Sequence, residues 1–553
     1  MTRRSRVDRL YVALLLLAAL VCVVVSIIYF TLTPGDLPGF LPGHVSKSPS
    51  TQHYWKRGAA ALLVALALLA VVAILGTRIR STFRPTFFQL LVGVAALGLL
   101  LRVAYVVAAR EDPVIGDGRH YHYVAGFLAD GKGFISPGWY LRFGTARPDA
   151  LHSPAWPLLL SLPTRLGLRT YLEQQFFACM IGATTIVTVG LIGRRLAGAR
   201  AGLIAAALAA LYPNFWRFER ELRSETLVLL GSAVAILLAF RFRERPSLGR
   251  AAALGSVCGV LALIRGEQVL LFGLLLIPLV LLTRGPAWPR RVGWLAVASM
   301  VGVAVIVPWA AYNTARFAEP VFLSTELGVT LHIANTPTTY RGERLGYADY
   351  DFAHLRRWKL SVFGARESRP VDDSTLDLEL RRESLNFVRN HLSRVPVVVL
   401  AREGRTWGLF RPFQQMEIEV LDTMGVGPSG KRVYRFSFFA FWLLAPAAAA
   451  GALILRRRNV TLIPLMAPIL TVITAAALTY GFTRLRASAE VSIVLLSAVT
   501  IAAALRRLRT ALAPSRRDAS SGPSFEGLGP SSSSHSRSSL RALEVLETTA
   551  RLT

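Results

Sequence analysis

Lysine, cysteine and acidic residues are scarce in this sequence. Only five of the 63 basic residues are lysines, and the chain has only 33 acidic residues. The three cysteines, Cys22, Cys179 and Cys258, all lie inside apolar runs. The sequence therefore excludes both a disulfide framework and a CxxC metal site. The bias towards arginine is typical first of a GC-rich genome and only second of phosphate chemistry.

Charged residues of both signs make up only 17% of the 553 residues, whereas 53% are apolar. These values argue against a soluble single-domain enzyme. A formal net charge of +30 would suggest a nucleic-acid partner in a soluble protein. Here the basic residues are interspersed between long apolar runs, so a membrane explains the charge and we expect no nucleic-acid partner.

Long apolar runs predict an all-α polytopic membrane protein. A helix needs about 20 apolar residues to cross the hydrocarbon core of a bilayer. We expect about 12 spans, of which 201–213 and 250–264 are short. Residues 155–162 are too few to cross and predict an interfacial or re-entrant helix. The predicted spans are about 10–32, 57–76, 87–109, 172–193, 201–213, 226–240, 250–264, 267–283, 292–312, 436–455, 460–480 and 489–505.

The arginines of the short loops predict the orientation. Each loop that is cytoplasmic when the N-terminus is inside carries three or more arginines, as the positive-inside rule requires. The first span lacks an A-x-A-like cleavage site, so we expect it to be retained. The predicted parts are a two-helix extension (1–86), a transmembrane core with an external loop at 110–171 (87–314), a small extracytoplasmic α/β or mixed domain (315–435), C-terminal transmembrane helices (436–505) and a disordered cytoplasmic tail (506–553).

The first external loop contains the most informative acidic residue. Tyr121, Val124, Ala125 and Leu128 recur at helical spacing, and Gly131 follows as a stop. Asp117 lies just ahead of this short amphipathic helix. On position alone, its expected role is to cap the helix.

A set of short motifs occurs in order along the chain. The first is Asp117, then tyrosine, then A-x-x-L-x-x-G-x-G-F ending at Phe134. The set resembles the C-type (GT-C) membrane glycosyltransferases, in the group of the protein O-mannosyltransferases and the lipid A aminoarabinose transferase, often called glycosyltransferase family 39. The other motifs are His152–Leu160, Arg223–Thr226, Ile264–Arg265, Pro308–Asn313 and Tyr480–Glu490.

This resemblance implies a GT-C-like helical bundle that takes a sugar from a polyprenyl-phosphate donor. It makes Asp117 the candidate catalytic base, which would take the proton of the acceptor hydroxyl. It also implies that Tyr121, His152 and Glu225 contact substrate. Members often carry Asp-Glu at the first acidic site, whereas Gly118 follows Asp117 here. This difference bears on which substrate the protein uses and on whether it needs a metal ion, more than on the class of reaction.

Arginines in the predicted outside turns are candidates to hold the donor phosphate. A guanidinium donates two parallel hydrogen bonds to phosphate and keeps its charge when partly desolvated. The alternative is pairing with glutamates inside the bundle, because charges within membranes are usually paired. The candidate phosphate ligands are Arg265, Arg484, Arg223 and Arg486.

The histidines and the outer region carry weaker signals. His120 and His122 flank Tyr121, but positions i and i+2 do not share a helix face, so we expect no metal site. No cofactor is required by the predicted chemistry, although a divalent metal is compatible with it. Asp112 and Asp149 are the other acidic loop residues, with a solvated charge as their simpler interpretation. Aromatics interleaved with arginines at 335–342 and 405–413 suit sugar contact, but packing is the favoured interpretation.

The sequence therefore predicts an inverting glycosyltransferase in a bacterial plasma membrane, with its active site on the extracytoplasmic face. Its expected partners are the lipid-linked donor, membrane lipids, and an acceptor that is a cell-envelope glycan, a lipid or a protein. The competing class is a transporter or flippase of a lipid-linked sugar, for which paired halves with broken helices are typical. No such repeat is visible in the sequence. A non-catalytic scaffold gains some support from the missing second acid after Asp117.

Overall fold

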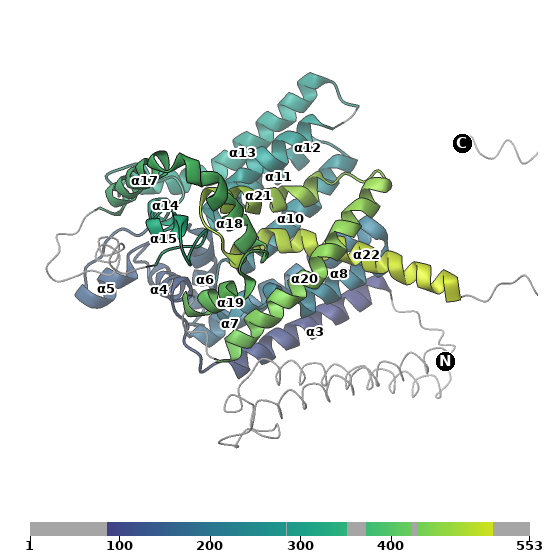
Figure 1. Ribbon diagram of the computed structural model, residues 1–553, viewed down its shortest axis with the longest axis horizontal. Helices are drawn as coiled ribbons and strands as arrows, with labels where there is room; N and C mark the ends of the chain where they lie inside the picture. The colour runs from purple at the N-terminus through teal and green to yellow at the C-terminus, as the bar shows by residue number, and fades with distance from the viewer. Residues whose placement is uncertain (1–85, 284, 351–371, 423–427, 513–553) are drawn as a thin grey trace, which may run out of the picture. The chain divides into compact units, whose positions relative to one another are not determined.

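The computed structural model describes residues 86–283, 285–350, 372–422 and 428–512. Regular secondary structure in these ranges is helical, and the nearest approach to a sheet is one antiparallel bridge between Ile135 and Pro148. The prediction of an all-α polytopic protein is confirmed for these ranges (Figure 1).

Six helices are long and apolar enough to cross a membrane, and four shorter ones are also apolar. These helices coincide with the ten spans predicted between residues 87 and 505, whereas the first two predicted spans lie outside the described ranges. The long ones are α3 (Phe87–Ala108), α7 (Tyr171–Ala197), α10 (Glu225–Glu244), α13 (Trp288–Thr314), α20 (Pro428–Arg457) and α22 (Ala487–Leu512). The shorter ones are α8 (Ala199–Leu211), α11 (Leu248–Ile264), the composite segment Gly266–Leu281 and α21 (Ile463–Leu478).

Shorter helices outside these spans carry much of the polar sequence. The interfacial helix expected at 155–162 is present as α6 (Ala155–Arg165). It packs on α4, and Figure 1 shows α14, α15 and α17 on the same side of the picture as α4. The remaining helices of this kind are α4 (Asp117–Ala129), α5 (Pro137–Phe143), α9 (Arg217–Arg220), α14 (Leu327–Ala334), α15 (Pro337–Tyr340), α17 (Asp373–Asn390), α18 (Val395–Thr406) and α19 (Pro412–Asp422).

The described part of 315–435 contains helices only, so the α/β or mixed character expected for this region is not seen there. Strong local helix signals explain the difference. At α17 the Asp372 side chain accepts from the backbone N–H groups of Ser374 and Thr375, and apolar residues such as Leu376 and Leu380 recur at helical spacing.

The composite segment after α11 is not a regular α-helix. Gly266–Leu270 forms a 3₁₀ turn, Phe272–Leu276 a π turn, and Ile277–Leu281 the short α12. Arg265 joins α11 to this segment with an extended backbone, φ −148° and ψ 131°. Turns of these types often occur at functional sites, and here the break moves Arg265 off the apolar helix face.

Small residues bring α11 and α13 into close contact beneath Arg265. A Cβ at Gly255 would collide with the backbone carbonyl oxygen of Ala298, and one at Gly259 would collide with that of Gly302. Glycines four residues apart let two helix backbones approach in this way within membranes. The end of α11 that carries Arg265 is therefore fixed against α13.

Candidate active site

Asp117 is the first residue of α4. Gly116 precedes it with φ +59°, a left-handed conformation that glycine adopts without a steric penalty. No side chain caps this helix. The expectation that Asp117 caps α4 is therefore wrong, because its carboxylate turns towards cations from distant parts of the chain.

Two arginines hold the carboxylate of Asp117. Arg223 Nη1 donates to Asp117 Oδ2 at 3.1 Å, and Arg484 Nη1 donates to the same oxygen at 2.7 Å. Arg223 lies just before α10, and Arg484 lies in the 3₁₀ turn Thr483–Arg486 before α22. Three segments far apart in the sequence thus meet at one carboxylate oxygen.

An unusual backbone conformation presents Arg223 to the site. Leu222 has φ +51°, which is costly for a side chain with a Cβ, and it is fully buried. Trp156 Nε1 donates to the Leu222 carbonyl oxygen at 2.8 Å and so fixes the turn from α6. Arg223 Nε also donates to Glu221 Oε2 at 2.5 Å, which orients the guanidinium.

The surroundings of Asp117 keep it ionised. Burial opposes ionisation, but Arg484, Arg223 and His152 outweigh it and hold the pKa of Asp117 well below its usual range. The side chain is still 26% exposed, so a substrate group can reach it. Asp117 is therefore a charged acceptor whose basicity the two arginines suppress.

His152 links Asp117 to a second carboxylate. Its Nδ1 lies 3.0 Å from Glu326 Oε2, and its Nε2 lies 4.0 Å from Asp117 Oδ1. Burial lowers the pKa of this imidazole, but Glu326, Asp117 and Asp149 outweigh burial and raise it to about 9. His152 is therefore a cation at neutral pH. For Glu326, burial is outweighed by His152, which lowers the pKa of the carboxyl.

Glu225 lies between two arginines. Its Oε1 accepts from Arg265 Nη1 at 2.7 Å and lies 3.7 Å from Arg484 Nε, and Arg265 Nε donates to Glu267 Oε1 at 2.6 Å. The buried Arg484 Nε has no hydrogen-bond partner within the described part of the chain. Glu225 thus brings Arg265 and Arg484 together and connects both to Asp117.

Tyr121 and Gly118 form the buried underside of the site. The Tyr121 hydroxyl donates to Ser224 Oγ at 3.4 Å, and its ring lies 5.0 Å from that of His152. A Cβ at Gly118 would collide with the backbone carbonyl oxygen of Glu221. The close contact between α4 and the turn before Arg223 explains why glycine follows Asp117 here.

Arg486 is not brought to this group, although it lies two residues after Arg484. Its Nε is 3.2 Å from Glu490 Oε1, and its guanidinium stacks over Phe441 at 3.8 Å. Glu490 also accepts from Asn214 Nδ2 at 2.8 Å. The alternative of pairing with glutamates is thus seen for Arg486, and Arg223 and Arg265 also pair with glutamates within the site.

The histidines of α4 point to separate partners. His120 Nε2 lies 3.1 Å from Asp149 Oδ2, whereas His122 stacks on Tyr171 and its Nδ1 lies 2.9 Å from Gln174 Oε1. Within the described ranges, no three His, Cys, Asp or Glu side chains are grouped to hold a metal ion. Asp149 is buried and is not a solvated charge.

The aromatic and arginine-rich outer segments are mainly packing elements. Arg405 is fully buried and donates to the carbonyl oxygens of Leu345 and Glu343 and to the Gln415 side chain. Tyr340 donates to Asn335 Oδ1 at 2.9 Å. These contacts confirm the structural interpretation for the residues that make them.

The sequence did not point to Glu326 or Ser224 as members of the site, and it offered Glu267 only as an ion-pair partner of the arginines. Glu326 lies 174 residues after His152, and no local pattern distinguishes it from other glutamates. Glu267 and Ser224 each neighbour a predicted site residue. Their proximity was a usable signal for these two, whereas only the fold brings Glu326 to His152.

The grouped side chains combine a reachable carboxylate with a dense set of fixed cations. Such a set can bind an anionic oxygen-rich group and stabilise negative charge that develops on it. The cations are Arg223, Arg265, Arg484 and His152, and the carboxylates are Asp117, Glu221, Glu225, Glu267 and Glu326.

Residues 151–312 match the family model described as dolichyl-phosphate-mannose-protein mannosyltransferase. The matched range includes His152, Arg223, Glu225 and Arg265, but neither Asp117 nor Arg484. The resemblance to the C-type membrane glycosyltransferases is thereby confirmed. A comparison with curated proteins found no match.

Two solved structures are distantly similar. The Archaeoglobus fulgidus oligosaccharyltransferase is 14% identical with a TM-score of 0.41, over 76% of this chain and 51% of that one. This chain thus spans about half the length of that enzyme. ArnT from Cupriavidus metallidurans, solved with undecaprenyl phosphate, is 17% identical with a TM-score of 0.35, over 74% of this chain and 77% of that one.

The charge on His152 predicts a pH-dependent contribution to stability. Its pKa in the folded protein, about 9, lies above the ordinary 6.5, so its contribution is complete below pH 6.5 and is lost as the pH rises through 9. We expect His152→Gln to lower the melting temperature in detergent at pH 6.5 and the gap to wild type to narrow by pH 9.5.

The matched control is His122→Gln on the neighbouring helix α4. Burial lowers the pKa of His122, so this histidine has no stabilising positive charge that a rise in pH could remove. The difference in melting temperature between His122→Gln and wild type should therefore not narrow towards pH 9.5. A gap for His152→Gln that stays constant from pH 6.5 to 9.5 would contradict the ion pair with Glu326.

Proposed function

We propose that this protein is a multi-pass membrane glycosyltransferase that transfers a sugar from a polyprenyl-phosphate donor to an acceptor hydroxyl with inversion. The observation that carries this proposal is the Asp117 carboxylate held by Arg223 and Arg484 beside the Arg265–Glu225 pair. The family match over residues 151–312 supports the reaction class.

The donor phosphate is assigned to Arg484 and Arg265. Arg484 Nε is buried and without a hydrogen-bond partner within the described ranges, and Glu225 keeps both guanidiniums in one place. A polyprenyl-phosphate sugar carries one negative charge, and the leaving phosphate gains a second as the sugar departs. Arginines fixed at this position therefore bind the transition state more strongly than the ground state.

Asp117 is the proposed base. The acceptor oxygen forms a bond to the anomeric carbon, its proton passes to the Asp117 carboxylate, and the bond between that carbon and the phosphate oxygen breaks. Attack from the face opposite the phosphate inverts the anomeric centre. No metal ion or organic cofactor enters this scheme.

Donor binding supplies the basicity that Asp117 otherwise lacks. In the structure Arg484 donates to Asp117 Oδ2 at 2.7 Å, so a phosphate that engages Arg484 competes directly with this carboxylate. Withdrawal of one arginine raises the proton affinity of Asp117. The acceptor is thus deprotonated efficiently only when the donor is in place.

The proposed location is the extracytoplasmic face of a bacterial plasma membrane. The arginine-rich short loops are assigned to the cytoplasm by the positive-inside rule, which puts 110–171 and 315–435 outside. The acceptor is then a glycan, a lipid or a protein of the cell envelope.

Deletion of the gene tests this function. We expect mass spectrometry of envelope extracts to show loss of one glycosylated product and accumulation of one polyprenyl-phosphate sugar, with the purified protein restoring transfer in vitro. Purified protein that moves a lipid-linked sugar across liposomes without transferring it would replace the proposal with a flippase.

Asp117→Asn separates a base from a positioning group. Asparagine keeps the size of aspartate but cannot take a proton, so we expect transfer to fall by roughly 10²–10⁴-fold, the range for general-base catalysis. Donor affinity should stay equal or increase, since the carboxylate no longer competes for Arg484. Initial rates and donor binding in detergent measure the two effects.

Asp130→Asn is the control for this variant. Asp130 lies at the other end of α4 and pairs with Arg169 on the surface, so its neutralisation should leave transfer near wild type. Near-normal transfer by Asp117→Asn would remove the base assignment.

Arg484→Lys and Arg265→Lys test the phosphate assignment. Lysine keeps the charge but not the planar pair of donors, so kcat/KM for the donor should fall roughly 10–100-fold in each variant. Arg169→Lys, at a surface ion pair, is the control. Unchanged donor kinetics in both site variants would show that neither arginine binds the phosphate.

A further inference from the structure

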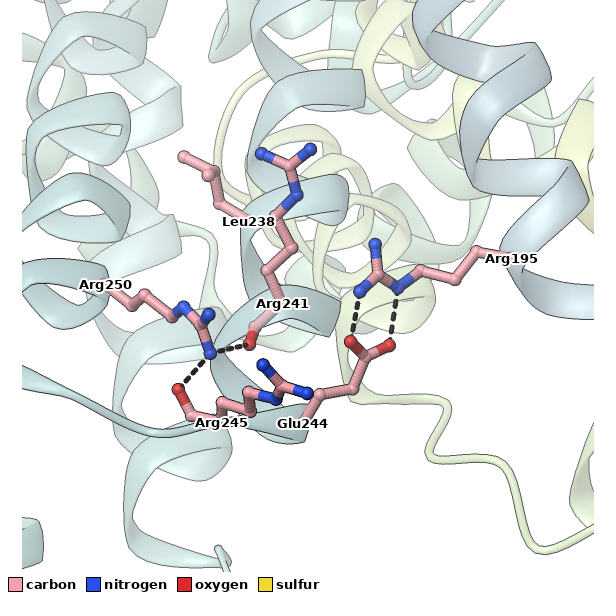
Figure 2. Close-up of a pocket in the computed structure, with 6 residues that line it drawn as sticks. All are labelled: Arg195, Leu238, Arg241, Glu244, Arg245 and Arg250. Atoms are coloured by element: carbon pink, nitrogen blue, oxygen red, sulfur yellow. Dashed lines mark hydrogen bonds and ion pairs between the residues drawn. The ribbon is translucent and has the colours of Figure 1, made fainter.

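An arginine-lined cavity lies far from Asp117, where α7, α10 and α11 come together. It has a volume of about 480 Å³, within the range of small-ligand sites. Figure 2 shows its lining side chains. They are Arg195, Leu238, Arg241, Glu244, Arg245 and Arg250.

Helix α10 puts this cavity at the membrane surface opposite to the candidate active site. Its first residue, Glu225, pairs with Arg265, and its last, Glu244, lines the cavity. An α-helix of 20 residues is about 30 Å long, which is the thickness of the hydrocarbon core. Arg195, near the end of α7, reaches the same level.

The lining arginines are used unequally. Arg195 forms a two-pronged ion pair with Glu244, and Arg250 Nη1 donates to the backbone carbonyl oxygens of Arg241 and Arg245 (Figure 2). The Arg241 guanidinium has no hydrogen-bond or ion-pair partner within the described ranges, and Arg245 adds a further cation. The lining of the cavity thus contains one carboxylate and four arginines.

Two of these arginines are fixed before a ligand arrives. The pair with Glu244 and the hydrogen bonds of Arg250 hold those guanidiniums in place, so less conformational entropy is lost when an anion binds. Guanidinium groups in the lining of a cavity favour a phosphate, because a guanidinium with free donors can donate two parallel hydrogen bonds to it. Leu238 adds an apolar wall towards the membrane interior.

We infer that this cavity binds the phosphate group of an anionic membrane lipid. The cavity lies at headgroup depth, and its excess of arginine matches a phosphodiester. Leu238 can contact the glycerol end of the acyl chains. Basic pockets between transmembrane helices at the inner surface suit such headgroups. A free phosphate ion shares the headgroup chemistry but makes no use of the apolar wall.

Lipid binding to the full-length protein in detergent micelles tests this inference. Native mass spectrometry with phosphatidylglycerol should detect one retained lipid, whereas phosphatidylcholine, which has no net charge, should not be retained. Millimolar inorganic phosphate should fail to displace the lipid. Displacement by phosphate, or equal retention of the two lipids, would overturn the assignment to an anionic lipid.

The double variant Arg241→Gln/Arg245→Gln removes the two arginines that are not fixed by the Glu244 pair or by backbone carbonyls. We expect phosphatidylglycerol to bind roughly 30-fold more weakly, because each arginine near a lipid surface contributes about fivefold. Gel filtration and the melting temperature check that the variant is folded.

Arg456→Gln/Arg457→Gln is the matched control. These arginines end α20, whose start lies near Arg217 through Tyr434, so they face the same membrane surface without lining the cavity. Their loss should change lipid binding little. An equal loss of binding in both double variants would show that general surface charge attracts the lipid, and no loss in either would show that these arginines do not hold it. Each result would overturn the inference. The measurement requires no transfer activity.

Discussion

The contact between Asp117 and its two arginines is the interaction on which the rest of the candidate site depends. It joins the start of α4 to the turn before α10 and to the turn before α22, three segments that are far apart in the sequence. Removing one partner of a buried ion pair leaves an uncompensated charge, which costs about 3–5 kcal/mol. The contact therefore connects the three segments that carry Asp117, Arg223 and Arg484.

The network around this contact is extensive because each charge has a second partner. Arg223 also binds Glu221, Arg484 lies beside Glu225, and His152 links Asp117 to Glu326. Charges near a membrane are tolerated when they are shared in this manner. The same arrangement makes the site responsive, since an incoming phosphate can replace a carboxylate at an arginine that is already in position.

Much of the fold could be predicted from the sequence because membrane spans have a strong local signal. Hydropathy located every apolar helix in the described part of the chain to within several residues, and helical spacing with Gly131 located α4. The helices within 315–435 were harder to predict, since they lack the long apolar runs that mark a membrane span, although α17 has a local cap and apolar residues at helical spacing. The sequence also did not predict that the segment after Arg265 begins with a 3₁₀ turn and a π turn, because the hydropathy of such turns does not differ from that of an α-helix.

By itself, the sequence determined the helical membrane class, the residue types needed for phosphate chemistry, and Asp117, Arg223, Arg265 and Arg484 as candidates. Only the tertiary structure decided which charges meet. Arg484 and Arg486 are nearly identical in local sequence context, yet the turn before α22 directs one to Asp117 and the other to Glu490. Arg486 and Glu490 lie only four residues apart, so their pair is local, whereas Arg484 and Asp117 are 367 residues apart and only helix packing between their segments brings them within hydrogen-bond distance.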